Sequence, residues 1–234
     1  MQLSKRLLNI AEMVTPGNIL VDVGTDHGYV PIYLMQEGVI NEALAMDINK
    51  GPLIGADKHI AEAGFAEKIR TRLSDGLKEY KKGEGDTILI AGMGGALVVK
   101  ILSQSIDKLE GIKELVLSPQ SEIFLVREFL KESGFVIEDE KMVFDDEKYY
   151  TIIKAVPGED SNTYTEWEMH YGYKMLEKKD EVLKEFLEKE RMNYSKILKS
   201  LNEQMSDTAR HRSEEIAEKV KGIERVLRIY YARN

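Results

Sequence analysis

The stretch LVDVGTDHGYVPIYL, residues 20–34, decides the fold. An apolar run reaches an acid, Asp22, and then opens into a glycine-bearing turn that leads into a helix. A strand buried in a parallel sheet would carry Asp22 and Gly24 to its carboxyl edge, where open α/β sheets bind ligands. Gly24 and Gly28 would let a ligand approach the backbone closely. The stretch predicts a site for a nucleotide-type cofactor, and its alternative is an ordinary strand-to-helix turn.

The charge of this turn separates two kinds of cofactor. A dinucleotide fingerprint, GxGxxG, places a pyrophosphate on the N-terminus of the helix. Here the turn reads GTDHG, and Asp26 stands where the second glycine would fall. Because the carboxylates of Asp22 and Asp26 would repel a polyanion, the turn favours a ligand with positive charge. The amino acid and sulfonium parts of S-adenosylmethionine are such a ligand.

Two further strand-like runs end in acids. EALAMDIN reaches Asp47, which lies 25 residues after Asp22, and IRTRLSDGL reaches Asp75 and Gly76. In this fold the acid that closes the second strand accepts hydrogen bonds from a ribose diol, and the third run could contact an adenine edge. Each acid alone could be a helix cap or a turn residue. Three acids at successive strand ends together predict a cofactor that contains adenosine.

The fourth strand-like run, DTILIAGMGG at residues 86–95, ends in a glycine-rich loop that would let a ligand or a flat base contact the main chain. Methyltransferases that act on exocyclic amino groups of bases usually carry an Asn/Asp/Ser-Pro-Pro-aromatic tetrad here. This chain has none, and the nearest sequence to it is SPQS, residues 118–121.

These motifs, together with LSKRL near the N-terminus and a helical C-terminal extension, resemble the bacterial tRNA (adenine-N1)-methyltransferase family that modifies adenine 22 in the D-arm region of tRNA. The resemblance covers nearly the whole chain. The segment TDHGYVPIYL distinguishes this family from generic Rossmann-like methyltransferases, which have GxG at this position. It implies an α/β fold with a Rossmann-like class I sheet, S-adenosylmethionine as cofactor and tRNA as partner. The expected cofactor contacts are Asp22, Gly24, Gly28, Asp47, Ile48, Asp75, Gly76 and Gly92. The target base is expected over Asp26, His27 and Tyr29 and the loop residues Met93, Gly94 and Gly95.

The chemistry of adenine N1 shapes the expected mechanism. N1 carries its own lone pair, so methylation needs no strong base, and positioning should supply most of the rate. The base must be unpaired or flipped out to expose N1. The Asp26 carboxylate could accept from the N6 amino group and stabilise the cation that methylation creates. Its alternative role is a helix cap, and the alternative for His27 is a buried, hydrogen-bonded histidine.

The chain is expected to divide into residues 1–160, the cofactor-binding domain, and residues 161–234, a helical domain. Residues 134–156 predict two antiparallel strands with an acidic turn between them. Beyond the boundary, apolar residues follow heptad spacing and predict a coiled-coil hairpin or an intermolecular dimer. The seam consists of Leu183, Leu187, Tyr194, Ile197, Leu201 and Met205 in one helix and Ile216, Val220, Ile223, Leu227 and Tyr230 in the other.

The net charge of −8 argues against a broad RNA-binding face, so any basic surface must be local. Residues 163–234 hold 15 Lys and Arg against 14 Asp and Glu, whereas the rest of the chain is strongly acidic. Arg210 and Arg212 are therefore candidate RNA contacts, and the alternative is a solvated helix face. Arg6, in an amphipathic N-terminal helix, is a third candidate and otherwise a surface arginine.

Several classes are disfavoured by composition. The chain has no cysteine, which is consistent with the cytoplasm, and no apolar run reaches the roughly 18 residues of a membrane span. The four histidines are scattered without ligand spacing, so no metal is expected. Methylation of another RNA site or a small molecule, or a non-catalytic cofactor-binding role, remain as alternatives, and the expected state is a monomer or weak dimer.

Overall fold

The computed structural model describes residues 3–203 and 206–232. The chain forms two compact units, Met1–Asn162 and Thr163–Asn234. Met205, the last residue of the first predicted seam, lies outside the described residues.

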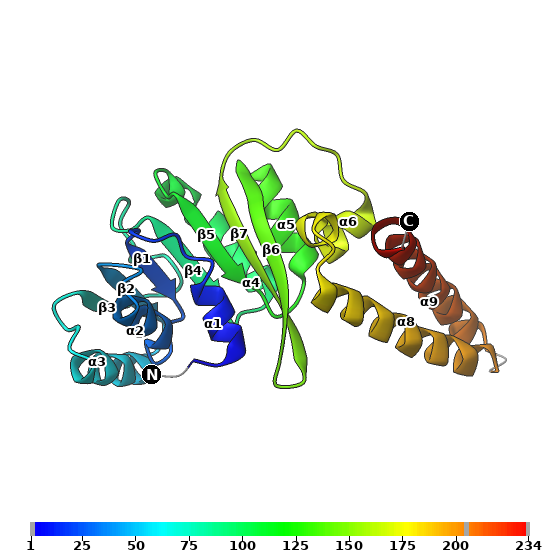
Figure 1. The fold of residues 1–234 in the computed structure, drawn as a ribbon, viewed down its shortest axis with the longest axis horizontal. Coiled ribbons are helices and arrows are strands. Elements are labelled where there is room, and N and C mark those ends of the chain that lie inside the picture. The colour runs from blue at the N-terminus through cyan, green and yellow to red at the C-terminus, as the bar shows by residue number, and fades with distance from the viewer. Residues whose placement is uncertain (1–2, 204–205, 233–234) are drawn as a thin grey trace. The chain divides into compact units, whose positions relative to one another are not determined.

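The first unit is built on seven strands in the described part of the chain. They are β1 (Leu20–Val23), β2 (Ala43–Asp47), β3 (Ile69–Leu73), β4 (Thr87–Ala91), β5 (Glu114–Ser118), β6 (Phe135–Asp145) and β7 (Lys148–Pro157). They form one sheet in the order β3-β2-β1-β4-β5-β7-β6 (Figure 1). The first five strands are parallel, and β7 is antiparallel to both β5 and β6. The predicted Rossmann-like α/β sheet is confirmed.

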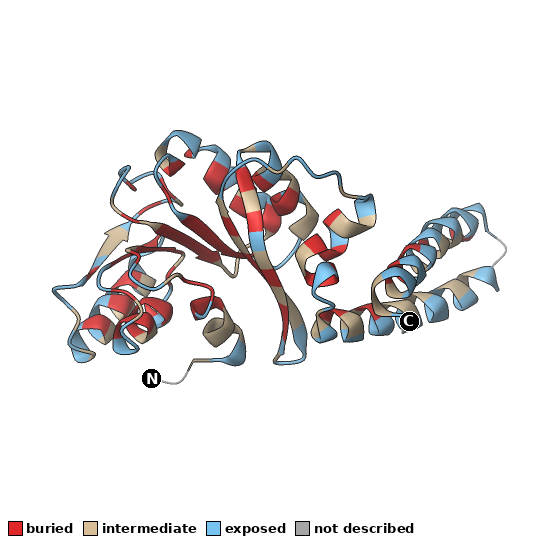
Figure 2. Ribbon diagram, turned by 45° about the horizontal axis from the view of Figure 1, so that its top comes forward, coloured by how far each residue is buried: buried red, intermediate tan, exposed pale blue. Residues whose placement is uncertain are grey.

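Helices cover both faces of this sheet. They are α1 (Lys5–Ala11), α2 (Tyr29–Gln36), α3 (Lys50–Glu62), α4 (Gly95–Ser103), the short η1 (Ile106–Leu109) and α5 (Ile123–Glu132). Helices α1, α2 and α3 share one apolar core with the sheet, whereas α4 and α5 pack together on the other face (Figure 1). Because both faces are covered, every residue of β1, β2 and β5 is buried (Figure 2).

Helix α1 is amphipathic, as its sequence predicts. The Ser4 hydroxyl caps it by accepting from the backbone N–H of Leu7, and Ile10 and Val14 are buried in the core beneath it. The backbone N–H of Arg6 donates to a carboxylate oxygen of Asp145 at 2.8 Å. The helix is thereby tied to the β6–β7 hairpin.

The second unit is helical. It contains α6 (Glu166–Tyr171), α7 (Tyr173–Glu177), α8 (Glu181–Asn202), α9 (Asp207–Val226) and the π-helical turn η2 (Leu227–Tyr231). Helices α8 and α9 pack against each other within the chain as a hairpin (Figure 1). A β-carbon on Gly222 would lie 2.1 Å from the ring of Trp167, so only glycine lets this ring pack on α9.

The predicted seam agrees with the burial at some positions and differs at others. Leu183, Leu187, Ile216 and Ile223 are buried. Ile197, which heptad spacing places in the seam, is instead 45 % exposed. A strict 3.5-residue repeat drifts relative to a straight helix, and the apolar contact therefore moves to a neighbouring position.

Candidate functional site

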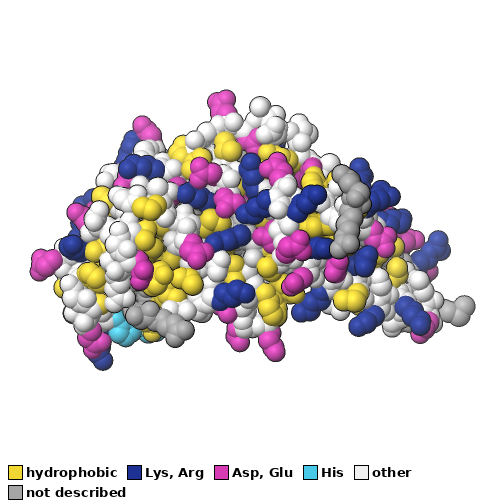
Figure 3. Space-filling model, viewed as in Figure 1, with side chains coloured by type: hydrophobic (Ala, Val, Ile, Leu, Met, Phe, Trp, Pro, Cys, Tyr) yellow, Lys and Arg dark blue, Asp and Glu magenta, His cyan; other side chains and the backbone are white. Residues whose placement is uncertain are grey.

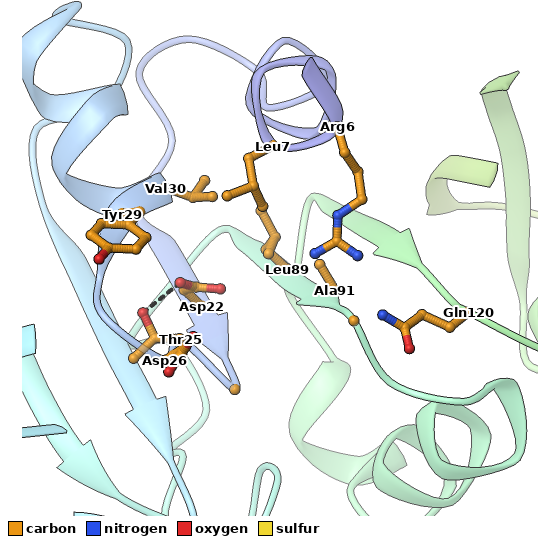
Figure 4. A pocket seen from close by; sticks show the side chains of 12 residues that line it. Arg6, Leu7, Asp22, Thr25, Asp26, Tyr29, Val30, Leu89, Ala91 and Gln120 are labelled. Atoms are coloured by element: carbon orange, nitrogen blue, oxygen red, sulfur yellow. Dashed lines mark hydrogen bonds between the residues drawn. The ribbon is translucent and has the colours of Figure 1, made fainter. Parts of the chain in front are cut away.

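Two cavities adjoin at the carboxyl ends of the parallel strands. The first, the Asp22 cavity, has a volume of about 310 Å³ and is shown in Figure 4. It is lined by Arg6, Leu7, Asp22, Gly24, Thr25, Asp26, Tyr29, Val30, Leu89, Ala91, Gly92 and Gln120. The second, the Asp47 cavity, measures about 340 Å³ and is lined by Val23, Gly24, Asp47, Ile48, Asn49, Ser74, Asp75, Gly76, Ala91, Gly92, Met93, Leu97 and Ile101. Both cavities share Gly24, Ala91 and Gly92, so one elongated ligand could occupy both.

The turn after β1 lies where the two cavities meet. The backbone N–H groups of Gly24 and Thr25 both donate to the carbonyl oxygen of Met46, at 2.8 and 3.0 Å, which pins the turn to the end of β2. Gly24 has a φ of +76°, a conformation that favours glycine. A β-carbon there would lie 2.4 Å from the Cε of Met93, so the position excludes a side chain for a second reason.

Asp22, near the end of β1, is a buried acid beside this turn. Its carboxylate accepts a hydrogen bond from the Thr25 hydroxyl at 2.6 Å. Burial raises the pKa of Asp22 to about 7; the Thr25 hydrogen bond partly offsets this effect, and the negative charge of Asp47 adds to it. A cationic group placed in the cavity would favour the ionised carboxylate and relieve this cost.

Asp47 and Asp75 line the second cavity in different surroundings. Asp47 is buried and accepts from the backbone N–H of Asn49 at 2.8 Å and from that of Asp26 at 3.4 Å. Asp75 is exposed and ion-paired with Lys78, and the hydrogen bond from Lys78 lowers its pKa. Asp47 is therefore a preorganised acceptor, whereas the charge of Asp75 is already compensated by its ion pair with Lys78.

The loops after β4 and β5 are joined by backbone hydrogen bonds. Three backbone N–H groups donate to backbone carbonyl oxygens across the two loops: Gly92 to Ser118 at 3.1 Å, Gln120 to Met93 at 2.9 Å and Gly95 to Ser121 at 2.9 Å. A β-carbon on Gly95 would lie 2.5 Å from the Ser121 carbonyl oxygen, so glycine is required for this close packing. The joined loops bring the side chain of Gln120 to the Asp22 cavity.

Arg6 supplies a positive charge to the Asp22 cavity. Its guanidinium lies over the ring of Tyr150, 5.0 Å from the centroid. It also faces Gly92, where a β-carbon would be 3.7 Å from an Nη atom of Arg6. The arginine therefore points into the cavity (Figure 4) and is not a free surface side chain.

Asp26 and Tyr29 line this cavity, and His27 lies between them in the chain. The Asp26 side chain is 69 % exposed and lies 3.5 Å from Nε2 of His27. Gly28 is the N-cap of α2 and no side chain caps that helix, so Asp26 does not act as its cap. The rings of His27, Tyr29 and His59 are 5.4–5.6 Å apart, and His59 Nδ1 donates to the His27 carbonyl at 3.1 Å. His27 is 43 % exposed, which differs from the buried alternative.

Some expected site residues lie elsewhere. Gly28 and His27 line neither cavity, and Gly28 instead faces Ala56 of α3, where a β-carbon would be 3.4 Å from the Ala56 Cβ. Gly94 and Gly95 begin α4, outside both linings. Arg210 and Arg212 are exposed on α9 and paired with Glu214 and Glu215, respectively. Side chains of both signs are interspersed on the face in Figure 3.

Sequence reasoning missed several lining residues, of which Thr25 and Gln120 are the polar ones nearest the expected chemistry. Thr25 lies inside the quoted turn, and its hydroxyl could have been noticed there. Gln120 follows a strand end in SPQS, but the signal is weak because the contact depends on how two loops pack. Among residues 3–203 and 206–232, no group of three His, Cys, Asp or Glu side chains could hold a metal ion. Within the same residues, no helix is both long and apolar enough to span a membrane.

The strand order, the acids at the ends of β1 and β2 and the two adjoining cavities define a class I, S-adenosylmethionine-dependent methyltransferase. Residues 20–225 match the family model TrmK, tRNA (adenine(22)-N(1))-methyltransferase. The chain belongs to this family.

Individual relatives support this family assignment. The tRNA (adenine(22)-N(1))-methyltransferase of Bacillus subtilis is 37 % identical over 164 residues, which are 70 % of this chain and 69 % of that protein. The structure of Sp1610 from Streptococcus pneumoniae in complex with S-adenosyl-L-methionine matches 97 % of this chain and 100 % of its own, with a TM-score of 0.84 and 30 % identity. TrmK of M. capricolum in complex with S-adenosyl-homocysteine covers 98 % of this chain and 100 % of its own, with a TM-score of 0.85 and 28 % identity.

Proposed function

We propose that this protein holds S-adenosylmethionine across the Asp22 and Asp47 cavities and presents N1 of adenine 22 of tRNA to it. The family assigns the reaction: the protein is an S-adenosylmethionine-dependent tRNA (adenine(22)-N(1))-methyltransferase. The observation that carries the residue assignments is the junction of two cavities at Gly24, with a buried acid in each.

The residues present fit this cofactor. Asp47, which receives two backbone hydrogen bonds and so has a fixed orientation, would accept from the ribose hydroxyls. Ile48 and the apolar side chains of Leu97 and Ile101 would flank the adenine, beside Asp75 and Gly76. Asp22 would face the cationic methionine part across Gly24 and Gly92. When bound, the cofactor supplies an electrophilic methyl group on its sulfonium.

The target adenine would lie in the Asp22 cavity between Tyr29 and Gly92. Alignment of N1 with the methyl carbon removes the entropy of a bimolecular encounter, which is worth about 7–11 kcal/mol in well-oriented systems. The exposed carboxylate of Asp26 would accept from the N6 amino group and stabilise the positive charge that develops on the ring. Tyr29 would stack on the base, and His27 supports Tyr29 at 5.4 Å.

The tRNA would bind beyond the cavity through local basic groups. Arg6 and the loop residues Met93, Gly94 and Gly95 would contact the nucleotides around the target, and Arg210 and Arg212 would contact phosphates. We place the binding region in the D-arm, where adenine 22 lies, and the enzyme in the cytoplasm. Helices α8 and α9 cover their buried apolar side chains against each other within one chain, which favours a monomer or a weak dimer.

The test is transfer of a labelled methyl group from S-adenosylmethionine to an unmodified tRNA transcript, followed by nucleoside analysis and mapping. The expected product is 1-methyladenosine at position 22, absent when that adenine is replaced by guanosine. If the protein binds S-adenosylmethionine but modifies no tRNA, the substrate assignment is wrong. Modification of another adenine would support the methyl-transfer reaction but overturn the assignment of position 22.

A further inference from the structure

The carboxamide of Gln120 is a polar group of the Asp22 cavity to which the roles above give no function. Its backbone N–H is fixed by the 2.9 Å hydrogen bond to the carbonyl oxygen of Met93. The side chain points into the cavity (Figure 4), and a β-carbon on Gly92 would lie 3.9 Å from Nε2 of Gln120. Gln120 is exposed, and within the described part of the chain its carboxamide forms no hydrogen bond with a protein group. It is therefore available to a ligand.

A carboxamide offers one donor and one acceptor side by side. Adenine shows the complementary pair on its Hoogsteen edge, where the N6 amino group donates and N7 accepts, and glutamine binds this pair in a bidentate manner. N1 lies on the other side of the N6 amino group. A side chain bound to N6 and N7 therefore leaves N1 free for methylation.

The position of Asp26 complements this contact. Asp26 belongs to the turn after β1 and Gln120 to the loop after β5, and they line opposite sides of the cavity (Figure 4). The N6 amino group has two hydrogens, one beside N1 and one beside N7. Asp26 can accept the first while Gln120 accepts the second, so both hydrogens are bonded.

We propose that Gln120 determines base specificity by binding N6 and N7 of the target adenine. The inference rests on the proposed function and adds to it how the site selects the base. Guanine carries acceptors at both O6 and N7, so it would place O6, where adenine has its N6 amino group, against both the Gln120 carbonyl and the Asp26 carboxylate. Adenine is accepted because it satisfies both side chains at once.

The experiment compares two tRNA transcripts that differ by one atom, with adenosine or 7-deazaadenosine at position 22. Loss of N7 removes the acceptor for the Gln120 amide and keeps N1 and N6. Since this change also alters the basicity of N1, the comparison is made between protein variants and not between RNAs alone. The wild-type protein should lose about three- to tenfold in kcat/KM on the 7-deaza transcript, as expected for one neutral hydrogen bond.

In Gln120→Ala the two transcripts should give nearly the same kcat/KM. Any difference that remains in this variant measures the effect of the 7-deaza change on the intrinsic reactivity of N1. Gln120→Glu keeps an acceptor for N6 but repels N7, so it should prefer the 7-deaza transcript. Gln104→Ala, an exposed glutamine at the end of α4 outside both cavities, is the matched control and should behave as wild type.

The outcomes distinguish a failure of the Gln120 role from a failure of the proposed function. An equal 7-deaza effect in wild type and Gln120→Ala overturns the role of Gln120, as does a loss of S-adenosylmethionine affinity in Gln120→Ala, which would make it a cofactor contact. Absence of 1-methyladenosine at position 22 of the ordinary transcript, with normal cofactor binding, overturns the proposed function itself. The melting temperature of each variant, measured without ligand, checks that it is folded independently of its affinity for S-adenosylmethionine.

Discussion

The hydroxyl of Thr25, in the turn after β1, donates a hydrogen bond at 2.6 Å to the carboxylate of Asp22, near the end of that strand, and both side chains are buried. This hydrogen bond favours the ionised carboxylate but does not outweigh burial, because the pKa of Asp22 stays raised at about 7. Without a cationic ligand the group is therefore about half protonated at neutral pH. Ligand binding and protonation of Asp22 are consequently linked.

Cofactor binding should weaken as the pH falls. If the bound cofactor holds Asp22 ionised, protonation of the free protein competes with binding below pH 7. The Kd for S-adenosylmethionine should then rise roughly 20-fold between pH 7.5 and pH 5.5. Calorimetry in buffers of different ionisation enthalpy should detect proton release on binding near pH 6. A Kd independent of pH in the wild-type protein would contradict this role.

The same acid should make the ligand-free protein less stable at higher pH. A folded-state pKa above the unfolded value of 3.8 means that stability is fully present below that value and is lost as the pH rises through 7. Between pH 5.5 and pH 7.5 this group should remove about 2 kcal/mol. Asp22→Asn lacks the ionisation, so its melting temperature should rise relative to wild type as the pH increases. A difference that stays constant with pH would argue against the raised pKa.

Much of the fold follows from local sequence. Buried strands in a parallel sheet are apolar along their whole length. The apolar runs before Asp22, Asp47 and Ala91 are strands, and each strand ends at or next to that residue. The carboxyl ends of such strands share one edge, so the adjacency of Asp22 and Asp47 could also be predicted.

The rest depends on contacts between distant segments. Gln120 reaches the cavity because three backbone hydrogen bonds join two loops, and no local pattern encodes them. Gly28, a predicted cofactor contact, has a positive φ of 73° and lies beside Ala56 of α3, a contact between segments that local sequence does not reveal. The displacement of Ile197 from the α8–α9 seam depends on the phase between two helices, which heptad spacing approximates only over a few turns.

Asp26→Asn should separate chemistry from cofactor binding. Asp26 has a φ of 55°, which asparagine tolerates, so the backbone should be kept. Loss of the negative charge beside N6 should lower kcat about 100-fold, the usual cost of one group that stabilises a transition-state charge. The Kd for S-adenosylmethionine should stay within about threefold of wild type. An equal loss in Kd and kcat would instead make Asp26 a cofactor ligand.

Gly24→Ala should block the junction of the cavities. The new β-carbon would collide with Met93 as well as adopt an unfavourable φ. Gly17→Ala is the matched control, because Gly17 has a similar φ of +88° and nothing within 4 Å of a β-carbon. Both variants should lose roughly 1 kcal/mol of stability from backbone strain, but only Gly24→Ala should lose more than about tenfold in S-adenosylmethionine affinity.

Combining Gly24→Ala with Met93→Ala should restore part of this affinity, since the colliding methyl group is removed. Equal loss of affinity in Gly24→Ala and Gly17→Ala would show that backbone strain, and not the Met93 contact, controls the site.

Arg210 and Arg212 test whether the second unit contacts tRNA. Both are exposed and ion-paired within α9, and exposed pairs of this kind contribute only about 0.2–1 kcal/mol to stability. Replacing both with alanine should therefore leave the melting temperature nearly unchanged. If they bind phosphates, KM for tRNA should rise about 5- to 20-fold, and the slope of log affinity against log salt should fall by up to about two.

Lys221→Ala is the control for this experiment, because Lys221 is equally exposed and paired with Glu218 on the same helix but is not a predicted RNA contact. It should change neither KM nor the salt slope. An unchanged KM in the double arginine variant would assign both residues to a solvated helix face. In that case the affinity for tRNA must come from the first unit, where Arg6 is the cation that lines the Asp22 cavity.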